Sequence, residues 1–378
     1  MATVKIIETD EDFISLKKEW DSILSNKRNV RIFQTFDWNY FAWTVYHRRE
    51  FTNSRLFLLH CTRDGHRDQR AILPLCITDN GTLHFIGQNI SDVLDIIVPE
   101  HEDNWHSFYK DIVKFLSEAD AVKEIDFHKL EGDSEFLQYL TVYMGNAEVL
   151  RMDSYSYLPV KRTDDFPGSL SHLTSKERSY IRSLSRKYSE CEYKTISLRN
   201  GDVYPKSEMT HLRDLMCALK MREKSFMPDA AIELLESIYN AGKCDISILC
   251  RDGIPVEMST RLYADAIINF WIVLYEEPAM TTVVDARYMA ERAAVADCVF
   301  DFGTGAYAYK LGSYRPLVRN LYRFKARNLS FINYVKDIWA VNRLYIKGTI
   351  EHSSPRLVTL IKDMRRMMRQ LGALIRRG

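Results

Sequence analysis

The sequence predicts an α/β protein in which a mixed sheet of hairpins and crossover helices occurs twice. An Asp-Gly pair lies between two apolar alternating runs at Asp64-Gly65 and again at Asp252-Gly253, and this pattern is a strong hairpin signal. In each half a helical pattern follows and leads to an apolar strand that contains one aspartate, Asp126 or Asp301. The agreement in order between the halves indicates a duplicated unit.

The first half contains a helix, a hairpin and a later strand. A helical pattern over residues 11–25 comes before the apolar run 56–61, which ends in the first Asp-Gly turn. The second strand of this hairpin covers residues 71–77, and the strand 124–128 carries Asp126.

The second half repeats this order and adds a strand. A helical pattern over residues 204–224 precedes the hairpin strands 246–250 and 255–263. A further strand follows over residues 266–275, and the strand with Asp301 closes the series.

A basic helix is expected between the halves. Ile181, Leu184 and Tyr188 give one apolar stripe, and residues 174–177 form its capping region. The basic residues around the stripe are Lys176, Arg178, Arg182, Arg186 and Lys187. They form either a solvated helix face or a phosphate-binding face.

The strand with Asp301 runs into the loop Gly303-Thr304-Gly305, and Tyr309 and Lys310 follow it. Glycine permits positive φ and a close approach of the backbone to a ligand, so such a loop often marks a site. The alternative is a strand, a turn and a helix start without a ligand.

Composition and charge are those of an ordinary globular protein. The chain has 378 residues, of which 46% are hydrophobic and 27% charged, and its formal net charge is +1. Bulk charge therefore gives no reason to expect DNA binding, and the length favours two domains. Seven cysteines without a C-x-x-C pair fit reduced thiols in a cytoplasmic protein, and the acidic N-terminus is not a signal peptide.

Several common chemistries lack their motifs. The sequence contains no H-E-x-x-H, no clustered metal-ligand pattern, no G-x-S-x-G and no G-x-x-x-x-G-K-[ST]. No metal is therefore expected. Gly303-Thr304-Gly305 also lacks the third glycine of a dinucleotide fingerprint.

Four segments in order resemble the bacterial tandem-GNAT acyltransferases of the CelD/BcsL type, which are associated with cellulose biosynthesis and related to the Fem aminoacyltransferases. The segments are residues 33–38, 86–95 and 175–186 and the stretch 300–310, and the resemblance spans roughly residues 5–330. It implies a degenerate GNAT-like domain over residues 1–160 and an acyl-donor domain over residues 161–334, with a helical tail over residues 335–378.

The resemblance also implies a chemistry, in which an amine attacks the carbonyl of an acyl-CoA thioester. Two strands splay apart and pair with the pantetheine arm, and a helix N-terminus receives the pyrophosphate. A carboxylate removes the ammonium proton, and a tyrosine or water protonates the leaving thiolate.

The expected catalytic residues are Glu257, Asp301 and Tyr309. Glu257 lies where GNAT folds often place the base, although its alternating strand also allows it to point to solvent. An unpaired carboxylate within an apolar strand is costly, so Asp301 needs a partner. The candidates for that ion pair are Arg287, Arg292 and Lys310.

Thr281, Thr282 and Arg287 are the expected contacts of the CoA moiety. The sequence departs from the family here, because residues 276–282 contain no glycine and begin with two glutamates. Acidic residues beside a pyrophosphate are unfavourable, which leaves room for another donor or for lost activity.

Lys310, Trp38, Asp37 and Asp92 are the expected acceptor contacts, since they match family positions. Lys310 suits a phosphate or a carboxylate. For Trp38 the alternatives are a core anchor and a sugar platform.

The tail carries ten basic residues against three acidic ones over residues 335–378, and apolar residues recur at helical spacing within residues 353–378. Such a helix packs on its own body or a second subunit, lies on an anionic membrane surface, or binds a partner protein.

The sequence thus favours a cytoplasmic N-acyltransferase that moves an acetyl or longer acyl group to an amine of a sugar or amino acid. The setting would be cell-surface polysaccharide or natural-product biosynthesis. One alternative is a Fem-like enzyme that uses aminoacyl-tRNA, and another is a non-catalytic scaffold of a polysaccharide-synthesis complex. Peripheral membrane contact and a homodimer are left open.

Overall fold

The structure is a computed structural model, and it describes residues 2–25, 27–66, 69–100, 105–144, 147–166, 168–305 and 314–327. Tyr309, Lys310 and the basic tail lie outside these residues. No helix within the described part of the chain is long and apolar enough to cross a membrane.

The first half of the chain contributes eight strands, which alternate with helices. These elements are β1 (Thr3–Ile7), α1 (Asp10–Ser15), α2 (Lys17–Leu24), η1 (Ile32–Gln34), α3 (Phe36–Phe41), the π-helix η2 (Ala42–His47), α4 (Arg48–Glu50), β2 (Ser54–Leu56), β3 (Leu58–Thr62), β4 (Arg70–Leu73), β5 (Leu75–Thr78), β6 (Thr82–Phe85), α5 (His106–Glu118), β7 (Glu124–Glu131), α6 (Glu135–Tyr143) and β8 (Glu148–Val160).

The second half repeats the pattern with longer strands. Its elements are α7 (Ser175–Lys187), β9 (Glu192–Ser197), η3 (Leu198–Asn200), α8 (Lys206–Ala218), η4 (Lys224–Phe226), α9 (Asp229–Asn240), β10 (Cys244–Arg251), β11 (Ile254–Ala264), β12 (Ile267–Tyr275), α10 (Pro278–Val295), β13 (Cys298–Thr304) and β14 (Leu317–Arg327).

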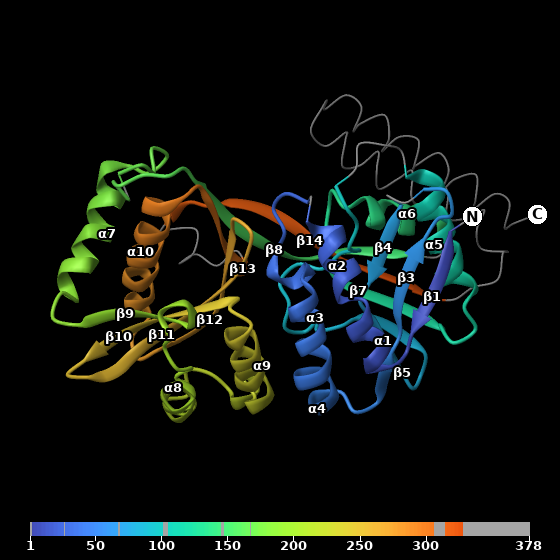
Figure 1. Cartoon of the computed structure of the whole chain (residues 1–378). Coiled ribbons are helices and arrows are strands. Elements are labelled where there is room, and N and C mark those ends of the chain that lie inside the picture. The colour runs from blue at the N-terminus through green and yellow to red at the C-terminus, as the bar shows by residue number, and fades with distance from the viewer. Residues whose placement is uncertain are drawn as a thin grey trace, which may run out of the picture.

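These elements build one mixed sheet that crosses both halves. Its eleven strands have the order β2-β5-β6-β7-β14-β8-β13-β12-β11-β10-β9, and β1, β3 and β4 form a separate three-stranded sheet. In the second half α7 and α10 lie on one face of β9–β12, and α8 and α9 lie on the other (Figure 1). The predicted α/β fold class is thereby confirmed, and the mixed sheets of the two halves are joined into one through β14 and β8.

The two long central strands are exchanged between the halves. β8 comes from the first half and pairs with β13 of the second half, with Phe300 opposite Leu158. β14 comes from the end of the second half and pairs with β7 of the first, with Phe324 opposite Phe127. β8 and β14 also pair with each other. Each half therefore completes its sheet with a strand of the other.

Both predicted hairpins are present. Asp252 and Gly253 have positive φ, as a type I′ turn requires, and join β10 to β11. In the first half Leu59 pairs with Leu73, and Leu56 pairs with Cys76 in the same register. This hairpin is therefore continuous across both sheets, and the third strand β6 follows it as β12 follows β11.

Helix α7 also matches its prediction. A capping box joins Thr174 and Glu177 at its start. Ile181, Leu184 and Tyr188 are buried, so its apolar stripe packs into the protein. Lys176, Arg182, Arg186 and Lys187 are exposed, whereas Arg178 donates to the carbonyl of Leu170. The predicted helix 11–25 differs, because it breaks at Leu16 into α1 and α2.

Candidate functional site

Two pairs of parallel strands part early along their length. β12 and β13 are paired through only three residue pairs, the last of which joins Asn269 to Asp301. β6 and β7 are paired through only two, the last of which joins Leu83 to Ile125. Beyond these pairs each strand keeps its other neighbour. Diverging strands can receive an extended ligand, which binds by adding to a strand edge. Side chains already bind some of the backbone groups here, since the N–H of Thr304 donates to Asp92 and the N–H of His128 donates to Gln88.

The loop of residues 86–95 spans the β12/β13 fork. Oδ2 of Asp92 accepts a hydrogen bond from the Asn269 side chain on β12 at 3.2 Å. Oδ1 accepts from the backbone N–H and the hydroxyl of Thr304 on β13, at 3.1 and 2.9 Å. Gly303 must be glycine here, because a Cβ would lie 2.8 Å from the Asp92 carboxylate and φ is +71°. Asp92 therefore ties a first-half loop to both diverging strands.

Trp38 supports this loop from the core. It is fully buried, and its indole N–H donates to the hydroxyl of Ser91 at 3.0 Å. Its ring meets that of Trp271 edge-on at 5.2 Å, and the indole N–H of Trp271 donates to the carbonyl of Ile90 at 2.7 Å. Trp38 is thus a core anchor that supports the loop. This agrees with the first of the two alternatives that the sequence left open, a core anchor and a sugar platform.

Asp301 lies at the fork and is 1% exposed. Its partner is Arg31 of the first half, whose Nε lies 3.5 Å from Oδ2 of Asp301. The N–H of Gly303 also donates to Asp301, at 2.9 Å. Burial raises the pKa of Asp301 to about 6, although the Arg31 guanidinium opposes this shift.

The ion pair of Asp301 with Arg31 differs from the sequence interpretation, which named Arg287, Arg292 or Lys310 as the partner, and of these Lys310 lies outside the described residues. Arg287 instead lies over the ring of Tyr193, with 5.5 Å between its guanidinium carbon and the ring centre. Arg31 was missed because it is 270 positions away in the sequence, and no local pattern marks it. It also binds Glu131 at 2.9 Å and the hydroxyl of Tyr155 at 2.8 Å.

The counterpart aspartate in the first half has a matching arrangement. Arg323 on β14 holds Asp126 with two hydrogen bonds of 2.6 and 2.7 Å. Burial alone would raise the pKa of Asp126, but hydrogen bonds from His128 and Arg323 hold it below its ordinary value. Each strand aspartate of the repeat thus takes its arginine from the other half of the chain.

The N-terminus of α10 begins beside the β12/β13 fork. Pro278 occupies its first turn, and Glu277 is its N-cap residue. Lys187 at the end of α7 lies 2.9 Å from Glu277, and Arg251 lies 3.9 Å from Glu276. Both glutamates that made this end unfavourable for a pyrophosphate are therefore paired with cations, which reduces the repulsion.

Thr281 and Thr282 follow within the first two turns of α10. The Thr282 carbonyl accepts a hydrogen bond from Tyr314 at 2.9 Å, and the Thr281 hydroxyl is buried without a partner among the described residues. Arg287 lies further along the helix, against β9.

Glu257 is fully buried under α10. It therefore does not point to solvent, which the alternating pattern of its strand had also allowed. The hydroxyl of Ser259 donates to its Oε1, while Oε2 has no partner within the described chain. Burial raises the pKa of Glu257 to about 8. Its strand neighbour Arg261 is also fully buried and binds Asp285 at 2.6 Å.

The remaining predicted site residues are not among those that meet at the fork in the described part of the chain. Asp37 forms an ion pair with Lys17 at 3.0 Å, and 22% of its side chain is exposed. Tyr309 and Lys310 lie outside the described residues. The structure therefore brings Trp38, Asp92 and Asp301 together with Arg31 and Asn269, two residues that the sequence interpretation missed.

No protein-family model and no curated protein sequence matches this chain. Solved structures do match it. FemX shares 12% identity with a TM-score of 0.52, and the alignment covers 85% of this chain and 96% of FemX. L-PGS of Bacillus licheniformis shares 15% identity with a TM-score of 0.50, over 86% of this chain and 96% of L-PGS.

A tandem GNAT protein from the clavulanic acid biosynthesis pathway also matches, with 10% identity and a TM-score of 0.50. The alignment covers 87% of this chain and 99% of that protein. The chain therefore has a tandem GNAT-type fold.

Proposed function

We propose that this protein is a GNAT-type N-acyltransferase that transfers an acetyl or longer acyl group from acyl-CoA to an amine. The observation that carries the proposal is the β12/β13 fork with the N-terminus of α10 beside it. The tandem GNAT fold supports it. The motifs that resemble the CelD/BcsL type favour an amine on a sugar or amino acid, in cell-surface polysaccharide or natural-product biosynthesis.

The donor would lie across the second half. Its pantetheine arm would pair with the free edge of β12 past Asn269, as an added strand pairs with a sheet edge. Its pyrophosphate would meet the backbone N–H groups at the start of α10, near Thr281 and Thr282. Lys187 would offset the charge of Glu277 at this end.

Asp301 is the best-placed of the predicted bases. A carboxyl with a pKa near 6 is mostly ionised at pH 7.5 and accepts a proton from the substrate ammonium, directly or through water, which frees the amine for attack. Glu257 has a pKa of about 8, so it is mostly protonated at pH 7 and a poorer acceptor. The amine nitrogen then bonds to the carbonyl carbon, the C–S bond breaks, and Tyr309 or water protonates the thiolate. The nitrogen gives up its remaining extra proton to the same tyrosine or to water, which leaves a neutral amide and a free thiol.

Binding and turnover test this function separately. Purified protein should show a rise in melting temperature with acetyl-CoA or a longer acyl-CoA, and thiol release with a panel of amino sugars and amino acids. Asp301→Asn should retain acyl-CoA binding and lose thiol release by 10²-fold or more, as expected for a general base. Absence of both the thermal shift and thiol release in the wild type would contradict the proposal.

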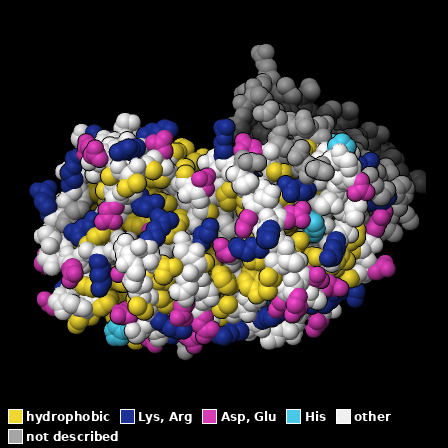
Figure 2. All heavy atoms as spheres, in the orientation of Figure 1, with side chains coloured by type: hydrophobic (Ala, Val, Ile, Leu, Met, Phe, Trp, Pro, Cys, Tyr) yellow, Lys and Arg dark blue, Asp and Glu magenta, His cyan; other side chains and the backbone are white. Residues whose placement is uncertain are grey.

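A second candidate is a Fem-like transferase that uses aminoacyl-tRNA. The observation that favours it is the exposed basic face of α7, with Lys176, Arg182 and Arg186, together with the likeness of fold to FemX. Lys and Arg side chains gather at this end of the molecule (Figure 2). A tRNA mobility shift that weakens steeply between 50 and 200 mM salt would support this donor.

The basic tail gives a proposal of its own, a peripheral contact with anionic membranes through residues 353–378. Liposome sedimentation of the full chain and of a chain without these residues tests it. If the full-length protein stays in the supernatant with anionic vesicles, this contact does not occur.

A further inference from the structure

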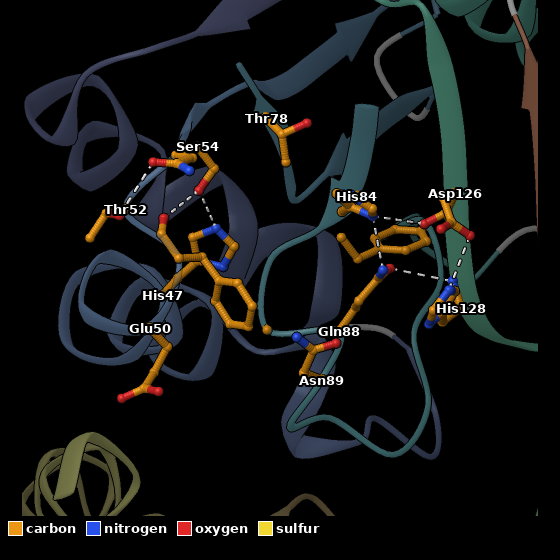
Figure 3. Close-up of a pocket in the computed structure, with 14 residues that line it drawn as sticks. His47, Glu50, Thr52, Ser54, Thr78, His84, Gln88, Asn89, Asp126 and His128 are labelled. Atoms are coloured by element: carbon orange, nitrogen blue, oxygen red, sulfur yellow. Dashed lines mark hydrogen bonds and ion pairs between the residues drawn. The ribbon is translucent and has the colours of Figure 1, made fainter. Parts of the chain in front are cut away.

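A pocket of about 420 Å³ lies in the first half, at the fork between β6 and β7. β6 supplies His84, β7 supplies Asp126 and His128, and the 86–95 loop supplies Gln88 and Asn89. The segment from His47 to Ser54 closes the opposite side. Figure 3 shows the imidazoles and amides turned toward the shared space.

The three imidazoles of this pocket are held by defined hydrogen bonds. His47 contacts the Ser54 hydroxyl at 2.6 Å, and His84 contacts the Gln88 amide at 2.9 Å. His128 lies 3.0 Å from the carboxylate of Asp126. Burial lowers the pKa of His47 to about 4 and also lowers that of His84, so these two rings are neutral at pH 7. A neutral ring has one donor and one acceptor nitrogen, and one of the two is already used here, Nε2 in His47 and Nδ1 in His84.

The pocket does not suit an anion. Among the described residues that line it, none is Lys or Arg, while Glu50 and Asp126 contribute carboxylates. Arg323 does contact the lining residue Asp126, but its guanidinium donates two hydrogen bonds to that carboxylate. The pyrophosphate of CoA would find no positive partner here, in contrast to the start of α10.

The lining suits a ring that carries hydroxyl groups. Hydroxyls both donate and accept, as do the amide of Asn89 and the hydroxyl of Thr52. His47 and His84 each add the one ring nitrogen that their hydrogen bonds to Ser54 and Gln88 do not use. Phe51 adds an apolar face that is 37% exposed. A sugar ring has this combination of hydroxyl groups and an apolar face.

The pocket is also physically joined to the β12/β13 fork. Gln88 lines the pocket, and Asp92 in the same loop binds Asn269 and Thr304 at the fork. Four residues reach at most about 14 Å. An acceptor of a few sugar rings bound in the pocket could therefore extend to the proposed acyl group at the β12/β13 fork.

We propose that the β6/β7 pocket binds an uncharged sugar ring and that this ring belongs to the acyl acceptor. The sugar site depends only on the geometry and chemistry of the lining. Its assignment to the acceptor rests on the proposed acyltransferase function.

Titration with glucose and glucose 6-phosphate, followed by ligand-observed NMR, tests the sugar site on the full chain without acyl-CoA. Saturable glucose binding is expected, with binding of glucose 6-phosphate at least tenfold weaker because no cation lines the pocket. Asn89→Trp should abolish glucose binding by filling the mouth. Asn89→Ala should weaken it about fivefold through one lost hydrogen bond.

Asn240→Trp is the matched control, since Asn240 is an exposed asparagine at the end of α9, and it should bind glucose as the wild type does. Melting temperatures establish that each variant is folded. No saturable glucose binding, equal binding by Asn89→Trp, or tighter binding of glucose 6-phosphate would overturn the sugar site.

Acetyl-CoA binding to the same samples separates the two proposals. Asn89→Trp should bind acetyl-CoA as the wild type does and lose thiol release only with sugar amines. Full thiol release with an amino sugar in Asn89→Trp would overturn the acceptor assignment. A wild type that binds glucose but no acyl-CoA refutes the acyltransferase function, while the sugar site stands.

Discussion

Arg31 and Asp301 form a buried contact between residues 270 positions apart, and the chemistry proposed for the fork depends on it. Asp301 has 2% of its side chain exposed and Arg31 has 16%. Removing one partner of a buried pair leaves an uncompensated charge, which costs far more than the net stabilisation by the pair. Arg31 also binds Glu131 and Tyr155, so its loss affects several groups.

Arg31→Met should therefore lower the free energy of unfolding by about 3–5 kcal/mol, measured by urea denaturation. Adding Asp301→Asn to this variant should recover part of the loss, because the unpaired carboxylate is gone. Arg55→Met removes an exposed ion pair with Glu8 and should cost less than about 1 kcal/mol. Equal effects of Arg31→Met and Arg55→Met would contradict the role of Arg31.

Glu257 predicts a pH dependence of stability. Its pKa is about 8 in the folded protein, against an ordinary value of 4.5, so the unfolded chain loses this proton first as pH rises. The wild type therefore loses stability between about pH 4.5 and pH 8, whereas a glutamine does not titrate.

Glu257→Gln should accordingly gain stability relative to the wild type across this window. The gain should be at most about 1.4 kcal/mol per pH unit and should level off above pH 8. Urea denaturation at pH 5, 6, 7 and 8 measures it. A difference that stays constant across these pH values would show that Glu257 ionises in the folded protein much as it does in the unfolded chain.

At the scale of elements, the start of α10 depends on the end of α7. Lys187 lies 2.9 Å from Glu277, the N-cap residue of α10. Hydrogen bonds from Lys187 and Tyr188 lower the pKa of Glu277, so this group is charged at neutral pH. The ammonium group of Lys187 therefore offsets the negative charge that a bound phosphate would meet at the start of α10.

Lys187→Ala should weaken acetyl-CoA binding about tenfold, measured by isothermal titration calorimetry, because Glu277 is then unpaired beside the pyrophosphate. Lys206→Ala is the control, since it removes a comparable ion pair with Glu236 on the opposite face of the sheet. If both variants bind acetyl-CoA equally, the pyrophosphate does not lie at this helix end.

Local patterns were sufficient for part of the fold. The period-2 runs and the Asp-Gly turns predicted both hairpins, and the 3.6-residue spacing of Ile181, Leu184 and Tyr188 predicted the buried face of α7. The burial of Glu257 was not predictable, because its flanking residues alternate as in a half-exposed strand and only the placement of α10 covers it. The same holds for Asn269, whose partner Asp92 lies 177 positions away.

At the scale of the whole molecule, the exchange of β8 and β14 makes the halves interdependent. β13 depends on β8 and β7 depends on β14, so each half alone would leave long unpaired strand edges. The aspartate of each half also takes its arginine from the other half. The predicted boundary at residue 160 would divide this shared pair of strands between two fragments.

Residues 1–160 and 161–378, expressed separately, should therefore each fail to fold cooperatively in thermal unfolding followed by circular dichroism. Co-expression should restore a stable complex that elutes as one species in gel filtration. A cooperative transition in either half alone would mean that the exchanged strands are dispensable.

The central claim is that the β12/β13 fork, and not the β6/β7 fork, holds the acyl donor. Hydrogen–deuterium exchange of the full chain with and without acetyl-CoA tests it most directly. Slower exchange is expected in residues 270–275 and 302–304 and in the first turn of α10, with residues 84–89 and 126–131 unchanged. Protection of residues 84–89 and 126–131 alone, or no protection anywhere, would contradict the account.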